Sequence, residues 1–180
     1  MPTEEDCRWR ASVKALRERR ETYTPERLAY YERIGLECVK FLRPSGDLLD
    51  VGAGAGSMRD LLGDRITSYV GIDPAPGSEC VIQGTAEALP WDDSTFSTVL
   101  FYSSLQHVLD PARALAEAHR VLRPDGRLAI QASVNDRNPL FMHHWAEGDV
   151  VAVVEGAGFA VEETRMIERR MVCLRGVRHG

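Results

Sequence analysis

The chain has 180 residues, 44% of them hydrophobic and 27% charged, which predicts one globular domain rather than a disordered chain. The net charge of −5 and the scattered arginines offer no basic face, so we expect no nucleic-acid partner. No apolar run approaches the roughly 18 residues of a membrane span. Because the charged N-terminus also lacks a signal peptide, we expect a cytoplasmic protein without a membrane partner.

Within a single domain over residues 1–180, we expect a helical cover (1–43) ahead of a core (44–180). One helix is expected over Glu4–Glu21, with three apolar side chains on one side: Trp9, Val13 and Leu16. A second helix is expected after Thr24, an N-cap that precedes a proline. Its buried face is predicted from helical spacing to consist of Leu28, Tyr31, Cys38, Val39 and Leu42.

From residue 48 onward, predicted strands alternate with predicted helices. The strands are expected at Leu48–Val51, Tyr69–Asp73, Cys80–Gln83, Thr98–Tyr102 and Arg127–Ala132. The helices are expected at Ser57–Leu62, Pro111–Leu122 and Val150–Ala157, with Gly158 ending the last one. This alternation predicts an α/β fold, a Rossmann-like, doubly wound and mainly parallel sheet covered on both faces.

Two connections modify this expectation. The last two strands, Phe159–Ile167 and Met171–Val177, are joined by so few residues that only an antiparallel hairpin is permitted. Six residues separate Asp73 from Cys80, whereas a parallel crossover normally takes about a dozen or more. We therefore expect the helix between the second and third strands to be shortened or missing, which would leave a ligand pocket more open on that side.

A glycine-rich turn follows the first strand of the core. The segment Leu48–Ser57 runs from a buried strand through Gly52, Gly54 and Gly56 into a helix. Glycine allows a tight turn and removes the Cβ atoms that keep a ligand off the backbone, and the helix start offers N–H donors. A cofactor lying across the carboxyl edge of the sheet would meet these groups first. A plain strand-to-helix turn would use the same residues.

Two aspartates lie near the ends of the first two core strands. Asp50 stands two positions before the first glycine, and Asp73 lies seventeen residues beyond Gly56. A carboxylate at the end of the second strand can accept hydrogen bonds from both hydroxyls of a ribose. An aspartate followed by proline is also typical of a simple turn.

Taken together, these residues resemble the class I S-adenosylmethionine-dependent methyltransferases. The resemblance is strongest to the small-molecule (type 11-like) group that includes the quinone-biosynthesis C-methyltransferases. Three further segments carry it, at 84–91, 96–111 and 117–130, and it spans roughly residues 31–174.

The resemblance implies a transferase that moves a methyl group from S-adenosylmethionine to a small-molecule acceptor by in-line displacement. It implies a cofactor site formed by strand ends and the loops after them: Asp50, Gly52, Ala53, Gly54, Gly56, Asp73, Pro74, Thr85, Ala86, Glu87 and Ser103. Within that set, Asp73 would bind the ribose, and Ala86 and Glu87 would meet the adenine.

Three histidines are candidates for a catalytic base, because histidine takes up protons near neutral pH. His107 lies just past the fourth strand, and His143 and His144 lie in a stretch, 135–145, that is expected to cross the pocket mouth. Each also has a structural interpretation, His107 as a packing residue and the other two as a solvated loop pair. Neither the histidines nor the scattered cysteines have metal-ligand spacing, so no metal site is expected.

Five aromatic residues could line an acceptor site or pack in the core: Tyr23, Tyr30, Tyr31, Trp91 and Trp145. Only the N-terminal helices and the 135–145 stretch are long enough to form a lid. We therefore expect either a compact acceptor or an active site completed by a second subunit of a homodimer.

Two other functions share parts of this pattern. An NAD(P)-dependent oxidoreductase would also carry a glycine turn and an acidic strand end. Against it stand Asp50, the terminal hairpin and the G-x-G-x-G spacing, in which Ser57 takes the place of the third glycine of the dinucleotide fingerprint. A non-catalytic protein that binds S-adenosylmethionine on the same fold stays open as well.

Overall fold

The computed structural model describes residues 3–20 and 24–178. Within these ranges, seven strands form one sheet in the order β3-β2-β1-β4-β5-β7-β6. The strands are β1 (Gly46–Val51), β2 (Ile66–Asp73), β3 (Val81–Gln83), β4 (Phe96–Tyr102), β5 (Leu122–Ser133), β6 (Phe159–Glu168) and β7 (Met171–Arg178). Strands β1 to β5 pair in parallel, and β7 is antiparallel to both β5 and β6. The predicted α/β fold with a terminal hairpin is confirmed.

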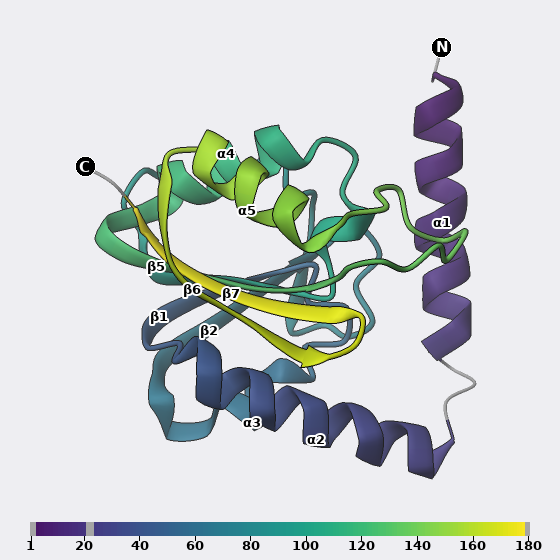
Figure 1. The fold of residues 1–180 in the computed structure, drawn as a ribbon, viewed down its shortest axis with the longest axis horizontal. Coiled ribbons are helices and arrows are strands. Elements are labelled where there is room, and N and C mark those ends of the chain that lie inside the picture. Colours follow the sequence, from purple (N-terminus) through teal and green to yellow (C-terminus); the bar gives the residue numbers. More distant parts are fainter. Residues whose placement is uncertain (1–2, 21–23, 179–180) are drawn as a thin grey trace.

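Helices lie on both faces of this sheet (Figure 1). They are α1 (Glu4–Arg20), α2 (Pro25–Leu42), α3 (Met58–Leu62), α4 (Pro111–Val121) and α5 (Glu147–Gly156), with short 3-10 turns η1 (Gly63–Arg65) and η2 (Leu105–His107). Because side chains alternate along a strand, Leu48 packs with α2 and α3 whereas the adjacent Leu49 packs with α4 and α5. The sheet therefore separates two hydrophobic clusters.

Helix α2 begins as the sequence predicts but buries less of its face. The Thr24 side chain accepts a hydrogen bond from the backbone N–H of Arg27, with Pro25 in the first turn. The buried residues of α2 start at Ile34, and Leu28 is 55% exposed. The prediction that Leu28 is buried is wrong, because the first turns of α2 extend beyond the sheet (Figure 1).

The connection between β2 and β3 contains no helix over residues 74–80, all of which are described. This confirms the expected loss of that element. The link instead packs on the glycine turn, since the Gly77 N–H donates to the Gly54 carbonyl at 2.8 Å and the Ser78 hydroxyl donates to the Ala55 carbonyl at 3.0 Å. Two short backbone segments thus support each other where a crossover helix would otherwise stand.

Helix α1 stands beside the sheet rather than on one of its faces (Figure 1). The helix expected over Glu4–Glu21 is present to Arg20, and Glu21 lies outside the described residues. No helix in the described part of the chain is long and apolar enough to cross a membrane.

Candidate functional site

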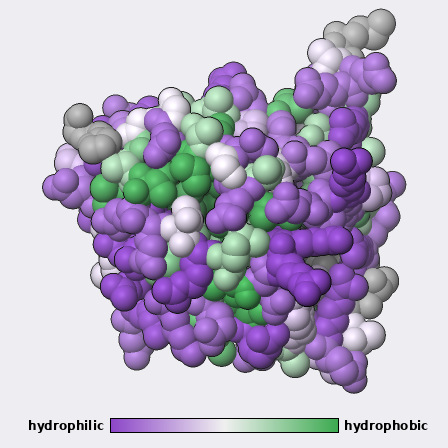
Figure 2. Space-filling model, in the orientation of Figure 1, coloured by the Kyte–Doolittle hydropathy of each residue, from purple (hydrophilic) through white to green (hydrophobic). Residues whose placement is uncertain are grey.

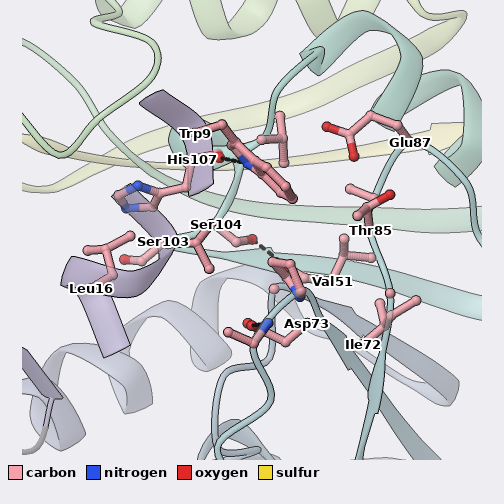
Figure 3. Close-up of a pocket in the computed structure, with 17 residues that line it drawn as sticks. Trp9, Leu16, Val51, Ile72, Asp73, Thr85, Glu87, Ser103, Ser104 and His107 are labelled. Carbon is pink, nitrogen blue, oxygen red and sulfur yellow. Dashed lines mark hydrogen bonds between the residues drawn. The ribbon is translucent and has the colours of Figure 1, made fainter. Parts of the chain in front are cut away.

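A pocket opens at the carboxyl ends of the parallel strands, the edge where ligands bind in open α/β sheets. Its walls come from α1, the ends of β1 and β2, and the segments after β3 and β4 (Figure 3). The lining residues are Trp9, Val13, Leu16, Val51, Gly52, Ile72, Asp73, Pro74, Ala75, Gly84, Thr85, Ala86, Glu87, Ser103, Ser104, His107 and Val108. Segments far apart in the sequence therefore meet around one cavity.

The turn after β1 requires glycine for two physical reasons. Gly52, Gly54 and Gly56 all have positive φ angles, of 78°, 61° and 81°, which L side chains rarely adopt. A Cβ on Gly52 would also lie 2.3 Å from the Ser104 Cβ. The backbone N–H groups of Gly52 and Ala53 donate to the Ile72 carbonyl, which ties this turn to the end of β2.

Asp73 connects the turns after β1 and β2. One of its carboxylate oxygens accepts from the Gly54 N–H and the other from the Ala75 N–H, both at 2.8 Å. The residue is half-buried and lines the pocket. Because each carboxylate oxygen has two lone pairs, these bonds leave accepting capacity that a ligand hydroxyl can use.

Asp50 lies beneath the turn and is 1% exposed. The Tyr69 hydroxyl donates to its Oδ2 at 2.6 Å. Burial, followed by the negative charge of Asp50, raises the pKa of Tyr69, so the hydroxyl stays protonated and donates. Asp50 is not among the described lining residues, and neither are the predicted cofactor residues Ala53, Gly54 and Gly56.

The segment after β3 supplies a second wall through Thr85, Ala86 and Glu87. Ala86 is buried, and Glu87 is half-buried. The Glu87 carboxylate accepts from the backbone N–H groups of Leu109 and Asp110, at 2.8 and 3.2 Å. Glu87 thereby joins the loop after β3 to the start of α4 while still bordering the pocket.

The segment after β4 forms a wall that contacts α1, since the Trp9 Nε1–H donates to the His107 carbonyl. Ser103 has a φ angle of 53°, a backbone conformation that is uncommon outside glycine and often found at functional sites. Its hydroxyl donates to the side-chain carbonyl of Gln131, and the Ser104 hydroxyl donates to the Val51 carbonyl. The sequence analysis did not identify Ser104, because a serine after a strand carries no distinctive signal.

Of the three candidate histidines, His107 lines the pocket. Its Nδ1 lies 3.2 Å from the Leu140 carbonyl, and its ring packs edge-on against Phe141. His143 and His144 are outside the described lining; their rings hydrogen-bond to the backbone carbonyls of Val108 and Asp136, respectively. His107 therefore combines the packing role with a position at the cavity.

The aromatic candidates lie elsewhere. Trp91 packs edge-on against Phe96 and Trp145 is buried in the larger core cluster, while Tyr30 and Tyr31 contact each other on α2. None of these four is among the described lining residues, and Tyr23 lies outside the described residues. Helix α1 instead contributes three apolar side chains to the cavity: Trp9, Val13 and Leu16. Helical spacing predicted that these three share a side, but not what that side covers.

Among the described residues, no group of three or more His, Cys, Asp or Glu side chains is placed to hold a metal ion.

Sequence comparison finds similar proteins for the central part of the chain. Residues 49–130 match a family model described as a methyltransferase domain. An uncharacterised methyltransferase of Mycobacterium tuberculosis is 37% identical over an alignment 112 residues long, which covers 56% of this chain and 46% of that protein. The chain spans about half the length of the first curated relatives it matches.

Solved structures share the fold. An S-adenosylmethionine-dependent methyltransferase of Thermotoga maritima has a TM-score of 0.74 at 23% identity, covering 96% of this chain and 100% of that one. The 1,6-didemethyltoxoflavin-N1-methyltransferase of Burkholderia thailandensis, solved with 1,6-didemethyltoxoflavin and S-adenosylhomocysteine, has a TM-score of 0.76 at 18% identity, covering 100% and 93%. Residues 49–130 therefore resemble a methyltransferase domain, and the chain shares the fold of solved S-adenosylmethionine-dependent methyltransferases.

Proposed function

We propose that this domain binds S-adenosylmethionine in the pocket at the carboxyl edge of the sheet and transfers its methyl group to a small-molecule acceptor. The observation that carries the proposal is the position of Asp73. Its carboxylate stands at the end of β2, lines the cavity and is held by the glycine turn through the Gly54 N–H. A carboxylate in this position can accept the hydroxyls of a ribose.

The residues present fit an adenosyl group. Gly52 brings bare backbone to the cavity, where a Cβ would collide with Ser104. Ile72 and Ala86 are buried apolar residues in the wall and suit the faces of a purine. When bound, the cofactor supplies an electrophilic methyl group, and the chain needs to provide position and shelter from water. Trp9, Val13 and Leu16 provide that shelter from α1.

We assign the role of base to His107, for acceptors that must lose a proton. A carbonyl oxygen only accepts hydrogen bonds, so the contact with Leu140 places the proton of the neutral ring on Nδ1. Nε2 is then the basic nitrogen. His143 and His144 lie outside the described cavity wall and are not needed for this step.

The acceptor is proposed to be a small molecule. Among the described residues that line the cavity, none is Lys or Arg, and a protein that holds a nucleic-acid backbone needs such cations. The 1,6-didemethyltoxoflavin-N1-methyltransferase, whose structure holds 1,6-didemethyltoxoflavin, supports the same class of acceptor. A cytoplasmic location, a single domain over 1–180 and a homodimer stay predictions.

Binding and turnover test the proposal separately. In a thermal-shift series, S-adenosylmethionine and S-adenosylhomocysteine should raise the Tm, whereas NADH and NADPH should not. Stabilisation by the nicotinamide cofactors alone would favour the oxidoreductase. Release of S-adenosylhomocysteine on a panel of metabolites should then identify an acceptor. Binding without turnover on any acceptor would favour the non-catalytic alternative.

The role of His107 is tested with the acceptor found in that panel. His107→Gln should lower kcat and remove the limb of the pH–rate profile that reports the ionisation of the base. His143→Gln serves as the matched control and should keep the wild-type profile. Superimposable profiles for His107→Gln and the wild type would exclude His107 as the base.

A further inference from the structure

Helix α1 is anchored mainly by polar side chains. The Trp9 Nε1–H donates to the His107 carbonyl at 3.0 Å, and the Arg8 guanidinium donates to the Phe141 carbonyl at 3.3 Å. The buried hydroxyl of Ser12 donates to the Leu140 carbonyl. Among the described residues, no α1 side chain belongs to either core cluster. The position of α1 is therefore tied to the pocket region and not to the packing of the core.

The side chains of Trp9, Val13 and Leu16 recur at spacings of four and three residues, so one side of α1 faces the cavity. Figure 3 shows how this side is distributed. Leu16 lies toward Ser103, whereas the Trp9 indole lies between His107 and the segment after β3 that carries Thr85 and Glu87. The Trp9 indole thus borders the part of the cavity that is lined by the segment after β3.

That part of the cavity suits a flat ring. Ile72, Ala86 and Val108 contribute buried apolar surface to it, and residues 74–80 form no helix that could cover it. An indole facing such walls completes an apolar slot. Aromatic rings gain additional stabilisation from stacked or edge-to-face contact with another ring.

We propose that Trp9 is a cofactor-contacting residue whose indole covers the purine of the adenosyl group. The hydrogen bond from Nε1 to the His107 carbonyl fixes the plane of the indole. This inference rests on the proposed function, since it concerns the same pocket and the same cofactor. It adds a wall that the sequence match over residues 49–130 does not contain.

Tryptophan fluorescence tests this proposal directly. The chain has three tryptophans, and Trp9 is the one found among the described residues that line the cavity. Titration of the wild type with S-adenosylhomocysteine should change the emission. Trp9→Phe should abolish that change, and Trp91→Phe, the matched control, should retain it. A change of undiminished amplitude in Trp9→Phe would overturn the proposal.

Fragments of the cofactor show whether the indole contacts the purine or the amino-acid part. Adenosine alone should reproduce the fluorescence change in the wild type, and L-homocysteine alone should not. The reverse result would place the indole over the amino-acid part and would contradict the assignment.

Calorimetry separates ring contact from anchoring of α1. Trp9→Phe keeps a ring and should bind S-adenosylhomocysteine within about threefold of the wild type, whereas Trp9→Ala should bind roughly tenfold more weakly. Ser12→Ala removes an anchoring contact but no ring, and should have the smaller effect. Equal losses in Ser12→Ala and Trp9→Ala would mean that the indole only anchors the helix.

The unfolding temperature of Trp9→Ala should stay close to that of the wild type, since no described α1 side chain belongs to a core cluster. If the wild type itself does not bind S-adenosylhomocysteine, the proposed function and this inference both fail. If the wild type binds and the Trp9 variants bind equally well, only this inference fails.

Discussion

Asp73 organises the pocket before any ligand arrives. Its two carboxylate oxygens accept hydrogen bonds from the N–H groups of Gly54 and Ala75, which lie in the turns after β1 and β2. Hydrogen bonds to a carboxylate are stronger than those between neutral groups. The geometry of the turn and the proposed acceptor for a sugar hydroxyl therefore depend on the same side chain.

We predict that Asp73→Ala weakens binding of S-adenosylhomocysteine at least tenfold, or about 1.4 kcal/mol, as measured by isothermal titration calorimetry. Asp73→Asn should lie between this variant and the wild type, because its amide keeps one accepting oxygen. An unchanged affinity in Asp73→Ala would exclude the ribose role.

The glycines of the turn should differ in their tolerance of a side chain. Gly52→Ala and Gly56→Ala both place alanine at positive φ, which costs about 1–2 kcal/mol. At Gly52 the new Cβ also meets Ser104 at 2.3 Å, whereas at Gly56 its nearest neighbour is Val81 at 3.4 Å. Urea unfolding should therefore show Gly52→Ala to be less stable than Gly56→Ala by roughly 1–3 kcal/mol. Equal stability would mean that the turn relaxes away from Ser104.

For single residues, the sequence predicts which residues line the cavity better than it predicts their hydrogen-bond partners. Gly52, Asp73 and Ala86 line the cavity because each lies at or shortly after the carboxyl end of a parallel strand, and the positions of these strands could be predicted from the sequence. The partners of Asp50 and Glu87 were not predictable. They depend on which side chains tertiary packing brings near, Tyr69 in one case and the Leu109 backbone in the other.

Among the elements, α4 fixes the cavity wall that follows β3. Arg120 of α4 donates to the carbonyls of Leu89 and Trp91 and pairs with Glu117 at 2.8 Å. The Glu117 carboxylate also accepts from the Leu89 N–H at 2.9 Å. A pair of α4 side chains thereby holds the loop that continues from Ala86 and Glu87.

This arrangement makes a prediction about pH. The hydrogen bond from Arg120, reinforced by the Leu89 N–H, holds the pKa of Glu117 below its ordinary value of 4.5. A lowered pKa in the folded state stabilises the protein above pH 4.5, and this contribution disappears as the pH falls through the lowered value.

Urea unfolding at pH 7 should therefore show Glu117→Gln to be less stable than the wild type by about 1 kcal/mol. The difference should shrink when the pH is lowered through the carboxyl range. Glu155→Gln, at an exposed position of α5, should change the stability little at any pH. A difference for Glu117→Gln that is independent of pH would contradict this account of the cluster.

For helix α2, one prediction from the sequence is confirmed and another is wrong. The N-cap at Thr24 is local chemistry and is confirmed. Burial of Leu28 was predicted from helical periodicity and is wrong. Periodicity describes the helix alone, and it cannot show where the sheet beneath α2 ends.

For the molecule as a whole, the order of the strands brings the site together. With β1 between β2 and β4, the turns after these three strands converge on one cavity, and β3 adds the fourth wall at the sheet edge. The alternation of strands and helices predicted the mainly parallel sheet, and the six residues between Asp73 and Cys80 predicted the missing crossover helix. The N-terminal helices were expected as a possible lid. The hydrogen bonds that position α1 were not predictable, because they join it to the distant backbone segment at Leu140 and Phe141.

The central claim is that this cavity holds an adenosyl cofactor above the glycine turn. The most direct measurement is a crystal structure of the protein with S-adenosylhomocysteine. We predict that the adenosine part lies in the cavity, with sugar hydroxyls within hydrogen-bond distance of the Asp73 carboxylate. A cavity without the ligand at saturating concentration, or a turn that binds the pyrophosphate of a dinucleotide instead, would contradict the account.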